Sequence, residues 1–298
     1  MNLKSMTAAD FVGLKVPPRQ FVFSPFLPVG GLAEIYARTG VGKTTFALAL
    51  SVAAATGTDF FSWQVKRSWN VLYVDGEMST QEMQERLNVT STHFGKPANG
   101  LTNLRLICRD RLQRGIPDIG STLGQSWFDD DAAWADVIFL DNLSCLWWSG
   151  RENDADAWSV IQQWLLKLKA SGKSIIMLHH SGKNGSSRGT SRRHDILDTV
   201  IRLERPPSYT ESEGAKFEVH FDKTRSFAGP KAEPIGMLYQ SDGTQADWSN
   251  FKITNERELE VAKLLQSGMR QREVANHLQI SQGQVSKLSG RAKSNGLI

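Results

Sequence analysis

The stretch ARTGVGKT, residues 37–44, decides the fold of this chain. It fits the pattern GxxxxGK[ST], with Ala37 in place of the first glycine. In such a loop the glycines let backbone amides curl around phosphate oxygens, the lysine bridges the β and γ phosphates, and the hydroxyl holds Mg²⁺. An apolar strand at residues 32–37 precedes the loop and an Ala-rich helix at 44–56 follows it, as the motif requires. We predict a site for ATP and Mg²⁺ that includes Thr39, Gly40, Val41, Gly42, Lys43, Thr44 and Thr45.

Outward from this loop, apolar strands alternate with helices. Continuous apolar strands of this kind belong to a parallel sheet covered on both faces. Breaks at RPPSYTESEG and SDGT indicate hairpins between about residues 200 and 248, so the sheet is expected to end in antiparallel strands. The predicted fold class is α/β. Strands are predicted at 69–74, 104–108, 137–140, 174–178 and 199–203, and helices at 79–87 and 155–170.

Composition and charge exclude several classes of protein. Of the 298 residues 40% are hydrophobic and 22% are charged, and the longest apolar run, residues 46–55, is too short for a membrane span of about 20 residues. Two cysteines, and an N-terminus broken by Lys4 and Asp10, predict a cytoplasmic protein without disulfides or membrane contact. The net charge is +4, and the last 46 residues hold seven Lys and Arg against four Glu. This excess points to nucleic acid for the tail, with a solvated surface as the alternative.

Three segments with different patterns indicate the domain organisation. Residues 1–28 are rich in proline and are expected to form an arm that packs on the outside of the next domain. Residues 29–250 carry the strand and helix alternation of the core. Residues 251–298 are purely helical and are predicted to form a small separate domain.

Carboxylates and histidines follow three of the predicted strands. Asp141 ends VIFLD and would hold the Mg²⁺ water shell. Asp75 and Glu77 end another strand; one can orient the attacking water, and at least one must cap the following helix. His179 and His180 end a third strand, where adjacent side chains point to opposite faces and so do not easily chelate one metal. One histidine is a candidate sensor of the γ-phosphate, and a buried neutral histidine is the alternative.

Three segments carry a family resemblance: VDGEMSTQEMQERL at 74–87, ADVIFLDNLSCLW at 135–147, and SIIMLHHSGKNGSSRGTSR at 174–192. Together they resemble the RecA/DnaB-type motor core, most closely the RepA-type hexameric helicases of small plasmids. The resemblance covers roughly residues 28–235. It implies a RecA-like fold, with Glu77 as the catalytic base and the histidine after the fourth strand, His179, coupling the nucleotide to a DNA-contacting loop.

The segment FDKTR, residues 221–225, resembles the KxR element of DnaB-type rings. That element puts a lysine and an arginine into the neighbouring subunit's site. The resemblance implies this role for Lys223 and Arg225, whose spacing places both on one face of a strand. An exposed strand with solvated cations is the alternative. The predicted catalytic residues are thus Glu77, Lys43, Arg225, Lys223 and His179.

The implied DNA loop combines cations with small residues. Its Gly and Ser residues suit a mobile contact to a phosphate backbone, and a solvated loop is the alternative. The candidate contacts are Lys183, Arg188, Arg192 and Arg193.

The tail resembles a helix-turn-helix module that runs toward a winged-helix end. Two helices are joined by a tight turn, and Ser281 with Gln284 makes a capping box at the start of the second. Gln279 stands where such turns often have glycine. In that docking mode Gln282, Gln284 and Lys287 would face base edges, with phosphate contacts from Arg270, Arg272 and Arg291. A protein-binding three-helix module is the alternative.

These observations lead to a predicted function. The chain is expected to be a ring-forming, hexameric, ATP-dependent DNA helicase or translocase of a plasmid, phage or mobile element, hydrolysing ATP between subunits. Its predicted partners are single-stranded and double-stranded DNA, further copies of the chain, and replication proteins. The alternative is a RecA-like ATPase that regulates or loads without unwinding. A small-molecule kinase would leave the tail, Lys223 and Arg225 unexplained.

Overall fold

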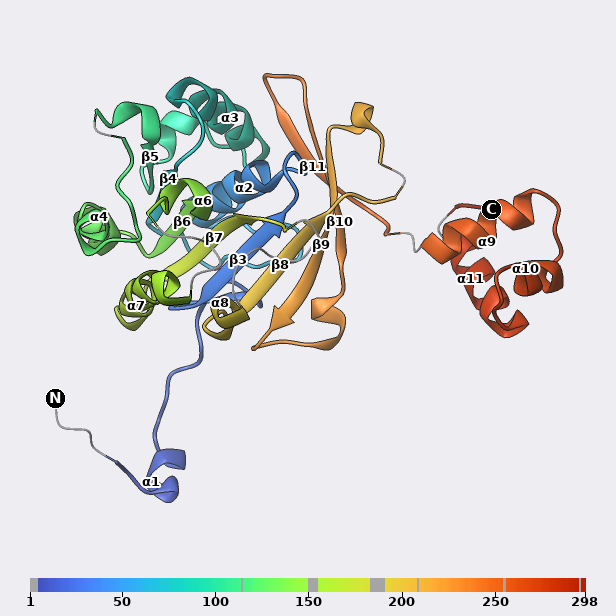
Figure 1. The fold of residues 1–298 in the computed structure, drawn as a ribbon, viewed down its shortest axis with the longest axis horizontal. Coiled ribbons are helices and arrows are strands. Elements are labelled where there is room, and N and C mark those ends of the chain that lie inside the picture. Colours follow the sequence, from blue (N-terminus) through green and yellow to red (C-terminus); the bar gives the residue numbers. More distant parts are fainter. Residues whose placement is uncertain are drawn as a thin grey trace.

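The computed structural model describes residues 5–113, 115–149, 155–182, 191–207, 209–253, 256–294 and 296–298. Its central element is a nine-stranded sheet in the order β11-β10-β9-β8-β3-β7-β6-β4-β5 (Figure 1). The parallel part comprises β3 (Leu32–Ala37), β4 (Val71–Asp75), β5 (Leu104–Cys108), β6 (Val137–Asp141), β7 (Ser174–His180) and β8 (Thr199–Glu204). The antiparallel part comprises β9 (Ala215–Thr224), β10 (Ile235–Ser241) and β11 (Ala246–Phe251). The predicted α/β class and the antiparallel end of the sheet are confirmed.

Two long helices cover one face of the sheet and one long helix covers the other. α2 (Lys43–Thr56) ends at Gly57, whose φ of 70° closes the helix through bonds to the carbonyls of Ala53 and Ala54. α3 (Thr80–His93) starts from a capping box between Ser79 and Glu82. α7 (Ala155–Ala170) lies on the opposite face. Shorter helices are α4 (Thr122–Ser126), α5 (Asp129–Trp134), α6 (Leu143–Leu146) and α8 (Ser191–Asp195). Single 3₁₀ turns lie at Ala98–Gly100, Arg109–Arg111, Glu211–Glu213 and Gly229–Ala232.

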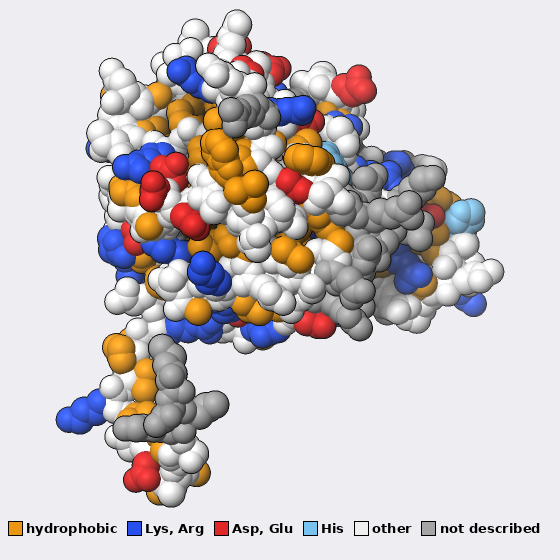
Figure 2. Space-filling view, turned by 60° about the vertical axis from the view of Figure 1, so that its left-hand side comes forward, with side chains coloured by type: hydrophobic (Ala, Val, Ile, Leu, Met, Phe, Trp, Pro, Cys, Tyr) orange, Lys and Arg blue, Asp and Glu red, His pale blue; other side chains and the backbone are white. Residues whose placement is uncertain are grey.

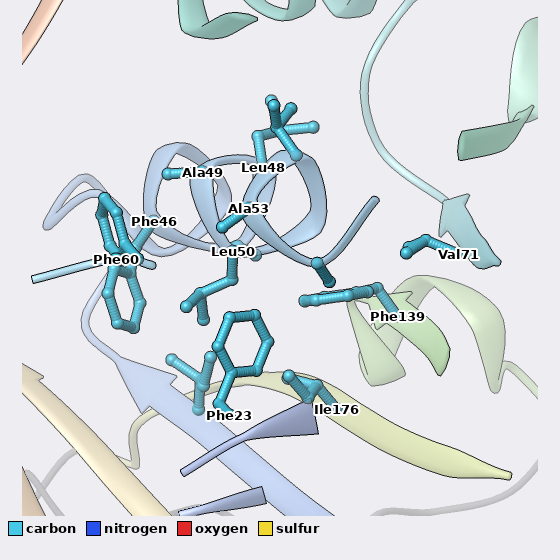
Figure 3. Close-up of a cluster of buried hydrophobic side chains, with 14 of the residues drawn as sticks. Phe23, Phe46, Leu48, Ala49, Leu50, Ala53, Phe60, Val71, Phe139 and Ile176 are labelled. Carbon is cyan, nitrogen blue, oxygen red and sulfur yellow. The ribbon is translucent and has the colours of Figure 1, made fainter. Parts of the chain in front are cut away.

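Because side chains alternate along each strand, each face of the sheet carries its own hydrophobic core. On the α2 face, Phe46 and Leu50 pack with Phe139 of β6 and Ile176 of β7 (Figure 3). On the other face, Trp158 and other residues of α7 pack with residues of β7 that include Ile175 and Met177. Because successive residues of a strand point to opposite faces, the position of a residue in β7 decides which core it joins.

The N-terminal arm differs from its prediction. Residues 5–20 are exposed, and α1 (Ala8–Val12) buries no residue. In Figure 2 the arm stands away from the rest of the molecule with hydrophobic side chains uncovered, and Phe11 is 63% exposed. The following segment, with β1 (Phe21–Phe23) and β2 (Leu27–Pro28), joins the core. The expectation that the whole arm packs on the core is therefore wrong for residues 5–20.

The C-terminal helices form a small unit with its own core. α9 (Glu256–Gln266), α10 (Gln271–His277) and α11 (Gln282–Ser294) pack around Val261, Val274, Ala275 and Val285. Figure 1 shows the three helices together, beyond the sheet edge formed by β11. We call residues 256–298 the tail. In the described ranges of the chain, no helix is long and apolar enough to cross a membrane.

Candidate functional site

The phosphate loop lies between β3 and α2, as predicted. Gly40 and Gly42 have φ values of 80° and 119°, a region that side chains other than glycine rarely adopt. A Cβ at Gly42 would also lie 3.0 Å from the ring of Phe217 on β9. Glycine is therefore required at position 42 by both backbone conformation and packing. The carbonyl of Gly40 accepts a hydrogen bond from Arg205, 2.9 Å away.

Lys43 is buried at the start of α2 with its ammonium close to the loop backbone. Its Nζ lies 3.3 Å from the carbonyl oxygen of Ala37 and 3.4 Å from that of Arg38. Burial lowers the pKa of Lys43, while Asp141 and Glu77 act in the opposite direction. An anion placed inside the loop would replace these weak carbonyl contacts with a charge-assisted one.

Asp141 is the last residue of β6 and lies under the loop, as predicted for the carboxylate that holds the Mg²⁺ water shell. Its carboxylate accepts hydrogen bonds from Tyr73, at 2.7 Å, and from Thr44. Burial raises the pKa of Asp141 despite these bonds and the nearby Lys43. Thr44 and Asp141, the two predicted metal residues, are thus in contact.

Asp75 and Glu77 have different roles in the structure. Asp75 is buried, and one of its oxygens accepts the backbone N–H groups of Glu77 and Met78 at 2.9 and 2.6 Å. Burial, followed by the charge of Asp141, raises the pKa of Asp75 to about 7. Glu77 instead lines the cavity in front of the loop. Asp75 shapes the turn, which leaves Glu77 as the candidate base.

This cavity has a volume of about 480 Å³ and joins the loop to the ends of β4, β6 and β7. Glu77, Glu82 and Asp141 line the cavity against the cations Lys43 and Arg86, and the nearby buried carboxylate of Asp75 has a second oxygen without a hydrogen-bond partner. This surplus of negative charge fits a divalent cation. Thr44 and Asp141 would hold Mg²⁺, which neutralises phosphate charge when bound.

The histidine prediction is corrected by the structure. His179, chosen from the sequence, is fully buried and does not line the cavity. His180 lines it, with Nδ1 3.2 Å from Lys43 Nζ and 3.4 Å from Thr39 Oγ1. The reason is alternation, because His180 continues the row of Ile176 and Leu178 that packs under α2. The alternation of side chains along β7 could be predicted from the sequence, but the sequence did not show which of its two rows of side chains faces α2.

Further residues of the cavity were missed from the sequence. Asn142 follows Asp141 and contacts both Glu77 and His180. Arg86 reaches the cavity from α3. Asn142 could have been found from its place next to Asp141, whereas Arg86 gave no signal because an exposed helix face commonly carries cations. Of the predicted loop residues, Thr39, Gly40, Gly42, Lys43, Thr44 and Thr45 line the cavity, while Val41 is buried beside it.

Lys223 and Arg225 lie away from the chain's own phosphate loop. Lys223 pairs with Val200 in β8, at the end of the sheet opposite the loop. The Lys223 ammonium donates to the carbonyl of His194, and the Arg225 guanidinium donates to that of Asp195. Both cations therefore bind carbonyls at the C-terminal end of α8, where positive charge also complements the helix dipole.

The predicted DNA loop is only partly described. Lys183 and Arg188, with the side chain of Arg192, lie outside the described residues. Arg193 is 3% exposed, and its Nε lies 3.0 Å from Oε2 of Glu34, a fully buried residue in β3. The prediction that Arg193 contacts DNA is wrong for this conformation, because its guanidinium is committed to a buried ion pair.

The tail places its candidate residues on its surface. Arg270, Arg272, Gln282, Lys287 and Arg291 are exposed, as is Gln284. The predicted capping box is present, with Ser281 N 3.0 Å from Gln284 Oε1 and Gln284 N 3.2 Å from Ser281 Oγ. The side-chain oxygen of Gln284 is thus occupied, and Arg291 lies 3.5 Å from Glu258. Gln279 has a φ of 53°, which explains why glycine is usual at this turn.

The fold and the site together define a P-loop ATPase of the RecA-like type, with a nucleotide cavity at the carboxyl ends of a parallel sheet. The family model described as "AAA domain" matches residues 1–186, more than half of the chain, and the protein therefore belongs to that family.

Similar solved structures show the same fold. The flagellar accessory protein FlaH from Methanocaldococcus jannaschii is 17% identical with a TM-score of 0.50, and the match covers 75% of this chain and 91% of that one. The KaiC-like protein PH0186 from Pyrococcus horikoshii OT3 is 15% identical with a TM-score of 0.54, covering 76% of this chain and 93% of that one. No curated protein matches the sequence significantly.

Proposed function

We propose that this ATPase assembles into a ring, hexameric by its resemblance to RepA-type helicases, and hydrolyses ATP at the interfaces between its subunits. The ring translocates on single-stranded DNA and unwinds duplex during replication of a plasmid, phage or other mobile element. Glu77 orients the attacking water, and Lys223 and Arg225 act on the nucleotide of the neighbouring subunit.

The observation that carries this proposal is the position of Lys223 and Arg225. Lys223 lies two strands from β3, level with Glu34, so its backbone is about 10 Å short of the loop along the strand direction. Two cations so placed cannot serve their own chain's phosphates without rearrangement of the sheet. We propose that they leave the carbonyls at the end of α8 and reach the cavity of a neighbouring subunit, which is open to the surface.

The test of a shared site is complementation between two inactive variants. Glu77→Gln keeps the donated cations but lacks the base, and Arg225→Ala keeps the base but lacks a donated cation. Each alone is expected to lose turnover, whereas an equal mixture should recover about a quarter of the wild-type rate, because about a quarter of random interfaces pair two intact halves. Lys43→Ala serves as the blank, and Arg105→Ala, an exposed arginine on β5, as the matched control.

The outcomes separate the possible functions. Recovery in the mixture, together with a ring-sized mass by light scattering and displacement of a strand from a forked substrate, supports the helicase. No recovery, with Arg225→Ala as active as Arg105→Ala, refutes the shared site.

One feature favours a second candidate, a DNA-binding regulator or loader that does not unwind. Gln282 and Lys287 are exposed at the start of α11, where a helix-turn-helix would meet duplex DNA. Turnover and duplex binding without strand displacement would select this alternative.

A further inference from the structure

Asn142 connects two groups of the cavity through one buried amide. Its Oδ1 lies 3.2 Å from the backbone N–H of Cys145 and caps α6. Its Nδ2 lies 2.7 Å from Glu77 Oε2 and 3.3 Å from His180 Nε2. The orientation of the amide follows from chemistry, because a carboxylate only accepts and a backbone N–H only donates.

His180 is held between two donors. Nε2 faces the Asn142 amide, and Nδ1 faces the Lys43 ammonium at 3.2 Å. A neutral imidazole has one acceptor nitrogen, so it accepts from only one of the two at a time. The ring proton is therefore on Nε2 when Nδ1 accepts from Lys43, and on Nδ1 when Nε2 accepts from Asn142.

A phosphate in the loop would draw Lys43 toward itself. His180 would then carry its proton on Nδ1, facing the cavity and Thr39, and its Nε2 would accept from Asn142. The second N–H of the same amide holds Glu77. Occupancy of the phosphate position is thereby linked to the orientation of the carboxylate through three side chains.

We propose that Asn142 is a positioning residue that holds Glu77 and links its orientation, through His180, to the presence of the terminal phosphate. The proposal rests on the proposed function, in which Glu77 orients the attacking water.

The first experiment compares variants that keep the cap of α6 but change the bond to Glu77. Asn142→Asp preserves shape and cap but points an oxygen at a carboxylate, and Asn142→Ser preserves a capping oxygen but lacks the N–H. We expect kcat to fall by about 30-fold in Asn142→Asp and about 10-fold in Asn142→Ser, with KM within about twofold of wild type, because each variant loses the charge-assisted hydrogen bond to Glu77. Asn250→Asp, at an exposed site on β11, is the matched control.

The second experiment does not depend on turnover. Ring ¹⁵N shifts report which nitrogen of His180 carries the proton, and a His180→Gln variant assigns the signals among the six histidines. AMP-PNP with Mg²⁺ is expected to place the proton on Nδ1 in wild type and to leave it on Nε2 in Asn142→Ala. The same tautomer in both proteins would overturn the link.

The two proposals fail in different ways. If wild type hydrolyses ATP no faster than Lys43→Ala, the proposed hydrolysis fails, and the tautomer measurement still judges the role of Asn142. If wild type is active and Asn142→Asp matches Asn250→Asp, the role of Asn142 is refuted while hydrolysis stands.

Discussion

The ion pair between Glu34 and Arg193 gives the sharpest prediction about stability. Glu34 lies in the middle of β3 and is fully buried, and Arg193 in α8 is 3% exposed. The guanidinium meets the carboxylate at two points, with Nε 3.0 Å from Oε2 and Nη2 3.4 Å from Oε1. Arg193→Met removes the guanidinium from a buried carboxylate whose other basic neighbour, the His194 imidazole, lies 3.9 Å from Oε1, so we expect the free energy of unfolding to fall by about 3–5 kcal/mol.

The double variant Glu34→Leu/Arg193→Met separates the pair from packing. Replacing both charges with apolar side chains is expected to change stability by less than about 1 kcal/mol, because no uncompensated charge remains. The assay is urea denaturation followed by tryptophan fluorescence, which reports on the core since all nine tryptophans precede residue 249. A loss below about 1 kcal/mol in Arg193→Met, or an equal loss in single and double variants, would refute the argument.

The remaining predictions concern pH, the tail and the arm. The pKa of Asp75 is about 7 in the folded protein against an ordinary 3.8, so between pH 3.8 and 7 the folded state binds more protons than the unfolded state. The free energy of unfolding should therefore fall as pH rises through this range, by at most about 4 kcal/mol. Asp75→Asn should remove this slope in urea titrations at pH 5 and 8 with EDTA; an unchanged slope contradicts the assignment. Gln279→Gly should relieve the left-handed backbone of the turn by about 1 kcal/mol and slow amide exchange in α10 and α11 roughly fivefold, whereas faster exchange would show that the turn is not strained. Phe11→Ser should change the free energy of unfolding by less than about 0.5 kcal/mol, since the side chain is 63% exposed, and a larger loss by thermal denaturation would mean that the arm packs on the core.

The phosphate loop and the parallel strands could be predicted because their signals are local. The loop needs glycine, lysine and a hydroxyl at fixed spacing, and each buried strand is a short apolar run between breaks. The capping box at Ser281 and the unusual turn residue Gln279 could also be recognised from the few residues around them in the sequence. These features depend on the backbone of their own segment and on little else.

The rest depended on contacts between distant segments. Arg193 stands in a run of cations and polar residues that looks solvated, and its partner Glu34 lies 159 positions away. The choice between His179 and His180 required knowing which face of β7 lies under α2. Asn142 acquires its contacts with Glu77 and His180 only when β4, β6 and β7 end side by side, so its position next to Asp141 marked it as a residue of the cavity but not as their partner.

The separate core of the tail has a thermodynamic consequence. The described part of the tail has a buried apolar cluster of four residues with six partly buried side chains packed against it, so we expect a unit of this size to be marginally stable by itself and to melt as an independent transition. A ligand that binds the folded tail at a hundred times its Kd would add about 2.7 kcal/mol to that transition and leave the core's melting unchanged. A shift in the melting temperature of the tail therefore identifies the partner that binds it. Duplex DNA, single strands and candidate proteins can each be presented in turn, and the partner will be the one that moves this transition alone.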